Sequence, residues 1–343
     1  MSKKRNLDSF TAGSECDDTP RDAVFDAKIE QLREEGYTVI ENVITPEKCA
    51  EYLASIYSYL QNCGIDATDD DLRQSAYPNL HGIIQQLEVG HSNGVWGVRQ
   101  DENVIEIFQK FYGTNDMLGS FDGLCVMPKR YRDSGKTWWH TDQSHQKPGL
   151  RCIQGYINLT DASDERTGSL VVIPGSHKYH THFATLFPEA AANKKDWFKF
   201  TTHQHLTALG GAPPKRVHGG IGSLVLWDSR TAHQASPPPR SVNEARVRCV
   251  VYVCYQPRSY ITARNLAKKQ KAFDEYRMTT HWPASKIELF SKTWRTYGQP
   301  IAANLRTPTR DRVETARMLE LAGKTALTTR PLRRTPPMLA FVN

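Results

Sequence analysis

Hydrophobic and polar positions divide the chain into a helical start, a β-rich middle and a helical end. Residues 1–22 are polar, mixed in charge and without apolar periodicity, which predicts a flexible tail. Phe25, Ile29 and Leu32 then recur at the spacing of one helix face, and Gly36 is a typical stop signal. A first helix is therefore predicted to end before residue 36.

The next segments predict a strand followed by two helices. Residues 37–44 alternate between apolar and polar side chains like a strand that is buried on one face. Thr45 is a suitable N-cap and Pro46 suits the first helical position, so we expect a helix that runs to residue 60. A further helix is expected over residues 103–112.

The β-rich middle extends from about residue 118 to residue 256. Clusters of Gly, Pro, Asp and Ser separate its short apolar runs, which indicates an all-β barrel or sandwich. The runs are residues 121–128, 150–159, 169–173, 223–227 and 246–255. The long insertion near 178–220 has the length of a lid or a binding loop.

Helical patterns return after residue 260. They predict helices over 265–277, 284–294 and 310–321, followed by a loose end. The domain organisation that we expect is a tail over 1–22, a β-domain with flanking helices over 23–260, and a basic helical extension over 261–343.

Charge is distributed unevenly over the 343 residues. The formal net charge is +7, but residues 258–343 alone carry 17 Lys and Arg against 6 Asp and Glu. The rest of the chain is therefore mildly acidic. A basic C-terminal quarter admits nucleic acid or another polyanion as a partner without requiring one.

Cysteines and apolar runs limit the class of protein. The seven cysteines are scattered without CxxC spacing, which is typical of reduced thiols rather than a disulfide or zinc framework. No apolar run approaches the roughly 18 residues of a membrane span, and the first residues lack a secretory apolar segment. We expect an intracellular, cytoplasmic protein without a membrane span.

Three residues carry the most informative chemistry. His140 and Asp142 are two positions apart, so on a strand they point to the same side. With His233 from a distant strand they would form a face of two histidines and one carboxylate. Such a face leaves positions of an octahedral iron(II) open for a cosubstrate and O₂. The HxD pair alone is a weak signal, and its neighbours strengthen it.

The surrounding motifs resemble one enzyme family. The segments His140-Thr-Asp142, Gly168–His177 and Gly222–His233 occur in the order found in phytanoyl-CoA dioxygenase-type iron(II)/2-oxoglutarate oxygenases. The segment that begins at Glu35 also resembles the N-terminal strand and helix of that family. The resemblance covers roughly residues 28–256 and implies a double-stranded β-helix, the cupin-like jelly roll, with N- and C-terminal helices.

The resemblance also implies the ligand set. His140, Asp142 and His233 match the metal-ligand positions of the family. A basic residue on the strand after His233 is expected to bind the distal carboxylate of 2-oxoglutarate. We favour Arg246 for this role because it begins the strand-like run much as the residue of the family does. Arg248 lies on the same strand face and is the alternative, since the Pro-rich loop lengthens the interval after His233 by about two residues.

Several further residues are candidates for contacts in the site. Thr141, Gln154, Tyr156 and Ser236 are expected near the cosubstrate. Trp138, His145 and Arg99 are weaker candidates for contact with the substrate, although a histidine such as His145 more often lies in an exposed loop. His177, which follows Pro-Gly-Ser, is expected to be a structural turn residue.

The implied activity is hydroxylation of a C–H bond in a small molecule, with 2-oxoglutarate and O₂ converted to succinate and CO₂. Related halogenases carry a small residue in place of the carboxylate, so Asp142 favours hydroxylation. One alternative is a catalytically modified jelly-roll binding protein that acts on a polyanion through its basic C-terminal region. Another is a cupin-like metal hydrolase or isomerase that does not use 2-oxoglutarate.

Overall fold

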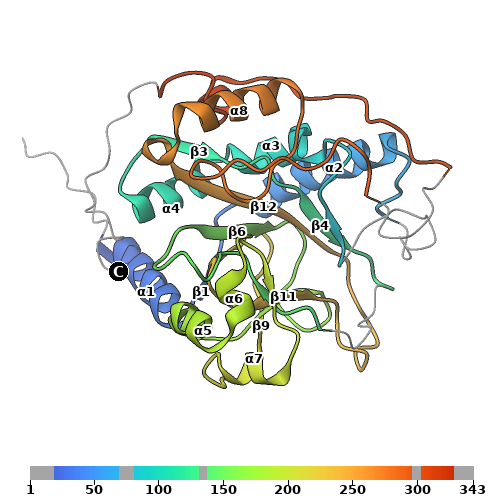
Figure 1. Ribbon diagram of the computed structural model, residues 1–343. Helices are drawn as coiled ribbons and strands as arrows, with labels where there is room; N and C mark the ends of the chain where they lie inside the picture. The colour runs from blue at the N-terminus through green and yellow to red at the C-terminus, as the bar shows by residue number, and fades with distance from the viewer. Residues whose placement is uncertain (1–18, 69–80, 131–136, 296–302, 328–343) are drawn as a thin grey trace, which may run out of the picture.

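The computed structural model describes residues 19–68, 81–130, 137–295 and 303–327 (Figure 1). Two antiparallel sheets lie face to face in this part of the chain. The larger sheet has the order β1 (Tyr37–Ile40), β10 (Leu224–Asp228), β6 (Ile153–Asn158), β12 (Arg248–Pro257), β4 (Leu124–Met127) and β2 (Ile83–Ile84), and β3 (Met117–Gly119) also pairs with β12. The smaller sheet has the order β8 (Phe198–Lys199), β5 (His140–Thr141), β11 (His233–Ser236), β7 (Ser169–Val172) and β9 (Lys215–Val217).

Strand pairing does not close the two sheets into a barrel within the described residues. The mainly β architecture with flanking helices is nevertheless the one predicted from the sequence, and its two antiparallel sheets are those of a jelly roll.

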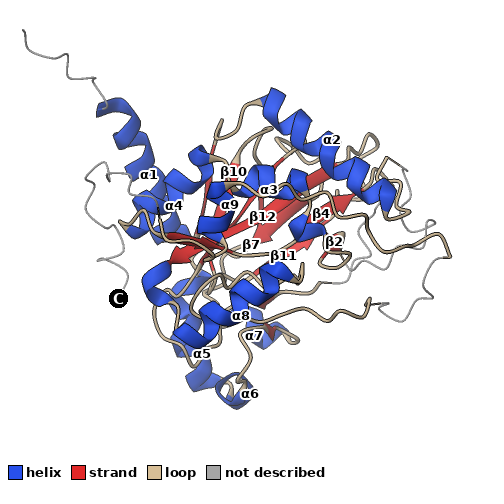
Figure 2. Ribbon diagram, turned by 90° about the horizontal axis from the view of Figure 1, so that it is seen from above, coloured by secondary structure: helices blue, strands red, loops and turns tan. Residues whose placement is uncertain are grey.

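Helices cover the outer face of the larger sheet. Figures 1 and 2 show α2, α3 and α8 lying across the strands on one side of the molecule. The helices outside the insertion are α1 (Thr19–Glu35), α2 (Pro46–Asn62), α3 (Asn93–Arg99), α4 (Glu102–Tyr112), α8 (Ala263–Asp274) and α9 (Ala316–Leu321), with single turns at Val89–His91 and Arg258–Tyr260. Side chains from α2, α3, α4, α8 and α9 share one hydrophobic cluster with this face of the sheet.

Strand β12 is buried on both faces. Cys249, Val251, Val253 and Tyr255 belong to the cluster under the helices, whereas Val250 belongs to the cluster between the two sheets. Because successive side chains of a strand point to opposite faces, a strand between two layers needs apolar residues at nearly every position. This explains the long apolar run that the sequence shows there.

The insertion forms a fourth layer on the outer face of the smaller sheet. It contains a turn at Ser176–Tyr179 and the helices α5 (His180–Leu186), α6 (Pro188–Ala192) and α7 (His203–Thr207), together with β8 and β9. Phe183, Phe198 and Phe200 pack there against Val171 and Ile173. In Figure 1 these helices lie at the opposite end of the molecule from α8.

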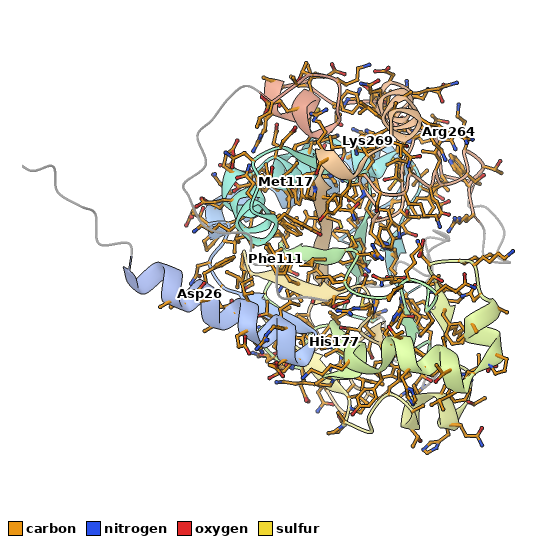
Figure 3. All side chains as sticks on the ribbon, turned by 60° about the vertical axis from the view of Figure 1, so that its left-hand side comes forward. Asp26, Phe111, Met117, His177, Arg264 and Lys269 are labelled. Carbon is orange, nitrogen blue, oxygen red and sulfur yellow. The ribbon has the colours of Figure 1, made fainter. Side chains whose placement is uncertain are left out.

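Helix α1 begins at Thr19, within the tail predicted over residues 1–22, and the rest of that tail lies outside the described residues. The signals for the end of α1 and for the start of α2 were read correctly. Thr45 caps α2 by accepting a hydrogen bond from the Lys48 N–H, and α4 matches the predicted helix to within one residue. Gly36 ends α1 with φ +80°, a conformation that favours glycine. His177 is a buried turn residue whose Nε2 bonds the carbonyl of Arg33 near the end of α1. Figure 3 labels His177 beside the C-terminal end of that helix.

Two of the predicted C-terminal helices were wrong. Residues 284–294 form no helix, because the chain folds back in β-like pairing between 278–280 and 288–290, where the Phe290 N–H bonds the Met278 carbonyl. Of residues 310–321, only the last six are helical. The preceding residues bond Asn93 instead, through Asp311 and Val313.

The segment after residue 260 is closely packed on the body of the protein. Lys269 and Phe273 of α8 are fully buried, and Lys269 is labelled on that helix in Figure 3. No helix of the described residues has the length and apolar character that crossing a membrane requires.

Candidate metal centre

His140, Asp142 and His233 form a compact cluster of potential metal ligands. One donor atom from each lies within 4.8 Å of the others. The cluster follows from strand pairing, because β5 pairs with β11 in the register that puts His140 opposite His233. Asp142 follows directly after β5, two positions from His140, so its side chain points to the same side. Its carboxylate oxygens are 3.7 Å from His140 Nε2 and 3.4 Å from His233 Nε2.

Backbone contacts orient both imidazoles for coordination. His140 Nδ1 is 3.0 Å from the carbonyl oxygen of Trp138, and His233 Nδ1 is 2.9 Å from that of Thr231. Since a carbonyl only accepts, each Nδ1 carries the proton and each Nε2 presents its lone pair to the cluster. Gln154 donates to Asp142 Oδ2 at 3.2 Å and orients the carboxylate. These donors fit a divalent iron ion.

The electrostatics of the cluster favour the protonation state that a metal needs. Burial, with a contribution from His233, lowers the pKa of His140 to about 3, so this imidazole is neutral at physiological pH. Burial alone would raise the pKa of Asp142, but the neighbouring imidazoles of His140 and His233 outweigh it and hold the pKa below its usual range. Neutral imidazole and ionised carboxylate are the forms that bind metal.

The cluster lies in the wall of a cavity of about 540 Å³. The cavity is enclosed by residues from the inner faces of both sheets, from the insertion and from the segment 280–295. Aromatic residues dominate its walls, and they are Trp138, Tyr156, Trp197, Trp227, Tyr252, Trp282 and Phe290. A cavity of this size and lining suits a small organic molecule.

Of the two arginines considered for 2-oxoglutarate, only Arg248 lines the cavity. The expectation that the strand begins at residue 246 was wrong by two residues, because β12 begins at Arg248. Arg246 lies before the strand, 40% exposed, and its Nη1 is 2.7 Å from the carboxylate of Asp161. Arg248 is buried, with its guanidinium carbon 4.8 Å from the centre of the Tyr156 ring.

Arg248 has no carboxylate partner in the part of the chain that the structure describes. Its Nη1 is 3.2 Å from the sulfur of Cys125, and its Nε has no hydrogen-bond partner within the described residues. A buried guanidinium without a carboxylate is costly, so this arrangement calls for an anion from outside the chain.

The other residues expected near the cosubstrate divide into two groups. Gln154 and Tyr156 line the cavity, as their alternation on β6 requires. Thr141 and Ser236 do not line it. The side chain of Thr141 is buried on the side of β5 opposite to His140 and Asp142. The hydroxyl of Ser236 accepts a hydrogen bond from Arg216.

Among the substrate candidates, only Trp138 reaches the cavity. His145 is neither exposed nor in the wall: its ring stacks on His180 at 4.3 Å in the aromatic layer of the insertion. Arg99 is fully buried on the helical side of the larger sheet, where it donates to the carbonyls of Gly90 and Asp122. Trp138 stacks between His81 and His140, which helps to hold the metal-ligand ring in place.

Several cavity residues were missed in the sequence. The most important are Asp122 and Trp197, together with Thr280, His281 and Trp282. Asp122 follows Phe121 at the beginning of a predicted strand, where a lone carboxylate indicates only a turn. Residues 280–282 carry no local signal for a site, because they reach the cavity through the packing of the C-terminal segment against the body.

Comparisons with known proteins place these features in a family. The model of the phytanoyl-CoA dioxygenase family (PhyH) matches residues 32–240. The chain is 28% identical over 284 residues to Ava biosynthesis cluster protein O of Aspergillus versicolor, which covers 78% of this chain and 89% of that protein. It is 23% identical over 240 residues to the ectoine dioxygenase of Stutzerimonas stutzeri (strain A1501), with coverages of 67% and 76%.

One solved structure extends the likeness over most of the chain. A crystal structure from Salmonella typhimurium LT2, described as an oxidoreductase, aligns with a TM-score of 0.53 over 89% of this chain and 84% of that chain. At 14% sequence identity this likeness concerns the fold alone.

Proposed function

Because the chain belongs to the phytanoyl-CoA dioxygenase family, we propose that His140, Asp142 and His233 bind its iron(II) and that Arg248 anchors its 2-oxoglutarate. The protein is an iron(II)- and 2-oxoglutarate-dependent dioxygenase. When bound, iron(II) with 2-oxoglutarate and O₂ supplies an oxidant that hydroxylates a C–H bond, with release of succinate and CO₂.

Strand register supports Arg248 as the anchor. Its guanidinium lies over Tyr156, and Gln154, two positions along β6, bonds the carboxylate of Asp142. Two residues of a strand span about 7 Å, which is comparable to the length of a five-carbon diacid. One carboxylate of 2-oxoglutarate can therefore pair with Arg248 while its other end reaches the metal ligands. Guanidinium suits this role because it binds a carboxylate through two parallel hydrogen bonds.

The cavity also suits a small-molecule substrate. Trp197 from the insertion and Trp282 from the C-terminal segment line the cavity that holds the metal ligands, so a bound substrate would displace water there. Asp142 retains its carboxylate, which fills the third protein-ligand position and favours hydroxylation.

The observation that carries the proposal is the convergence of two Nε2 lone pairs, one carboxylate and one unneutralised guanidinium on a single cavity. Anaerobic titration of the protein with iron(II) and 2-oxoglutarate tests it. We expect the weak visible charge-transfer absorption of the chelated cosubstrate in the wild type and its loss in His140→Ala and Asp142→Ala. The matched control is His182→Ala, which removes an exposed histidine of α5 outside the cavity.

Two results would contradict the assignment. One is full absorption in both ligand variants, which would exclude these residues as ligands. The other is iron binding without any response to 2-oxoglutarate, which would favour a metal hydrolase or isomerase of the same fold.

A further inference from the structure

The cavity wall contains a further buried carboxylate, Asp122, just before β4, the strand whose other end pairs with Arg248. The carboxylate of Asp122 lines the cavity and is only 6% exposed. Its Oδ1 accepts from the Gly123 N–H at 2.7 Å and from Gln85 Nε2 at 3.3 Å. Its Oδ2 has no hydrogen-bond partner among the described residues. The Oδ2 atom is therefore available to a ligand inside the cavity.

No cation of the described residues neutralises Asp122. Arg99 contributes to lowering the pKa of Asp122, but it donates to the backbone carbonyls of Asp122 and Gly90 and not to the carboxylate. His281, also in the cavity wall, contributes to lowering the pKa of both Asp122 and Asp142. Burial raises the pKa of Asp122 and outweighs the opposing effects of the Gly123 N–H, His281, Gln85 and Arg99.

Other polar atoms near Asp122 are also unsatisfied. Thr280 Oγ1, His281 Nε2 and Trp282 Nε1 are buried in the cavity wall without hydrogen-bond partners among the described residues. Buried polar atoms are normally paired, so three consecutive unpaired ones at a cavity indicate a ligand-binding surface. These residues lie beyond the range 32–240 that the family model matches.

The walls around Asp122 complete the chemistry of an organic cation site. Tyr252 lines the same cavity, as do Trp282 and Phe290, which have Lys147 and Arg295 over one face of their rings. Aromatic faces attract ammonium groups and also cover apolar carbon, while a buried carboxylate binds N–H donors strongly. Of the other acidic residues of the wall, Asp142 belongs to the metal-ligand cluster, Asp196 binds Lys147 and Lys286, and Glu288 binds Lys286.

We propose that the substrate is an organic cation, a protonated amine or amidine on an apolar body, whose nitrogen binds Asp122 beside His281 and whose body packs on Trp282 and Phe290. The proposal rests on the proposed function, since it assigns the substrate of that site. The cavity then binds two molecules of opposite charge: Arg248 binds the anionic cosubstrate, and Asp122 binds the cationic substrate.

Paired probes of the same shape test the proposal. Calorimetry on the anaerobic protein with iron(II) and 2-oxoglutarate would compare phenethylamine with phenethyl alcohol, tyramine with tyrosol, and tryptamine with tryptophol. We expect at least one amine to bind tenfold or more tightly than its alcohol. Asp122→Asn keeps the size of the side chain and should abolish this preference, while 2-oxoglutarate affinity stays unchanged. Glu288→Gln, a matched change of a paired acid at the same cavity, should leave the preference intact.

Three outcomes would overturn the proposal: equal binding of amine and alcohol to the wild type, a preference retained in Asp122→Asn, or no binding of any amine. Equal binding would indicate that Asp122 is protonated and donates to neutral substrates. All three leave 2-oxoglutarate binding intact, whereas failure of the proposed function would remove it.

Discussion

Arg248 is the residue whose replacement best separates cosubstrate binding from folding. Methionine occupies a similar length, and replacing a buried charge by an apolar side chain is often tolerated. Arg248→Met removes the charge-assisted hydrogen bonds to 2-oxoglutarate, which contribute about 1.5–3 kcal/mol, so the Kd should rise roughly 10- to 100-fold. Anaerobic titration of the charge-transfer band measures this Kd.

Arg246→Met is the matched control for that experiment. Arg246 pairs with Asp161 outside the cavity, so its loss should leave the Kd for 2-oxoglutarate within about twofold, as expected for a surface ion pair. The reverse pattern, with a large effect at 246 and a small one at 248, would return the role to the residue favoured from the sequence.

At the residue scale, the cluster of His140, Asp142 and His233 could be located from motifs, because their spacing reflects strand alternation. The choice between the two arginines could not. Locating the arginine by its distance from His233 assumes a loop of constant length. The Pro-rich loop is longer, and β12 begins at Arg248, two residues after the predicted start. Asp122 could not be found either. Its burial in the cavity wall and its Oδ2, unpaired among the described residues, result from the tertiary structure, and the local sequence does not indicate them.

At the element scale, the insertion supports the strand that carries His140. Strand β8 of the insertion pairs with β5 and brings Lys199 opposite His140. Phe183 of α5 is fully buried at the centre of the aromatic layer that holds β8 in place. The insertion is thus part of the metal centre's support as well as a wall of the cavity.

Phe183→Ala should therefore weaken both the fold and metal binding. Truncation of a buried phenylalanine typically costs about 3–5 kcal/mol in the free energy of unfolding. We expect a lower thermal midpoint, measured by calorimetry, and a reduced upward shift of that midpoint on addition of iron(II). Leu186→Ala on the same helix is the control, since Leu186 is 50% exposed and should change neither. A full iron(II)-induced shift in the destabilised variant would show that the insertion does not support the metal centre.

Element prediction succeeded where local signals agree with packing and failed where tertiary contacts decide. The capped helix α2 and the strand β12 follow from local sequence. Residues 284–294 carry apolar residues at helical spacing, but hydrogen bonds to 278–280 draw them into β-like pairing.

At the scale of the whole molecule, the basic C-terminal quarter meets the acidic body within the protein itself. Several of its cations form ion pairs with acidic residues of the body, and these are Arg258 with Asp116, Arg310 with Glu88, Arg317 with Glu102, and Lys286 with Asp196. Part of the positive charge of the C-terminal quarter thus forms ion pairs within the protein. Polyanion binding by this region stays a prediction.

This packing predicts that the C-terminal quarter unfolds together with the body. Leu321 of α9 is fully buried in the cluster that also contains Phe108 and Val253. Leu321→Ala should cost about 2–5 kcal/mol and lower a single calorimetric transition. Val313→Ala, at a residue 68% exposed, should have little effect. A separate early transition in Leu321→Ala, with the main one unmoved, would instead identify an independent extension.

The two buried faces of β12 have a consequence for how this enzyme can diverge. Even-numbered positions from Arg248 to Cys254 face the interior of the sandwich or the cavity, whereas odd-numbered positions from Cys249 to Tyr255 hold the helices. Selection for new chemistry and selection for folding therefore act on alternate residues of one strand. Substitutions at the even-numbered positions can therefore change substrate preference, while the odd-numbered residues continue to hold the helices in place.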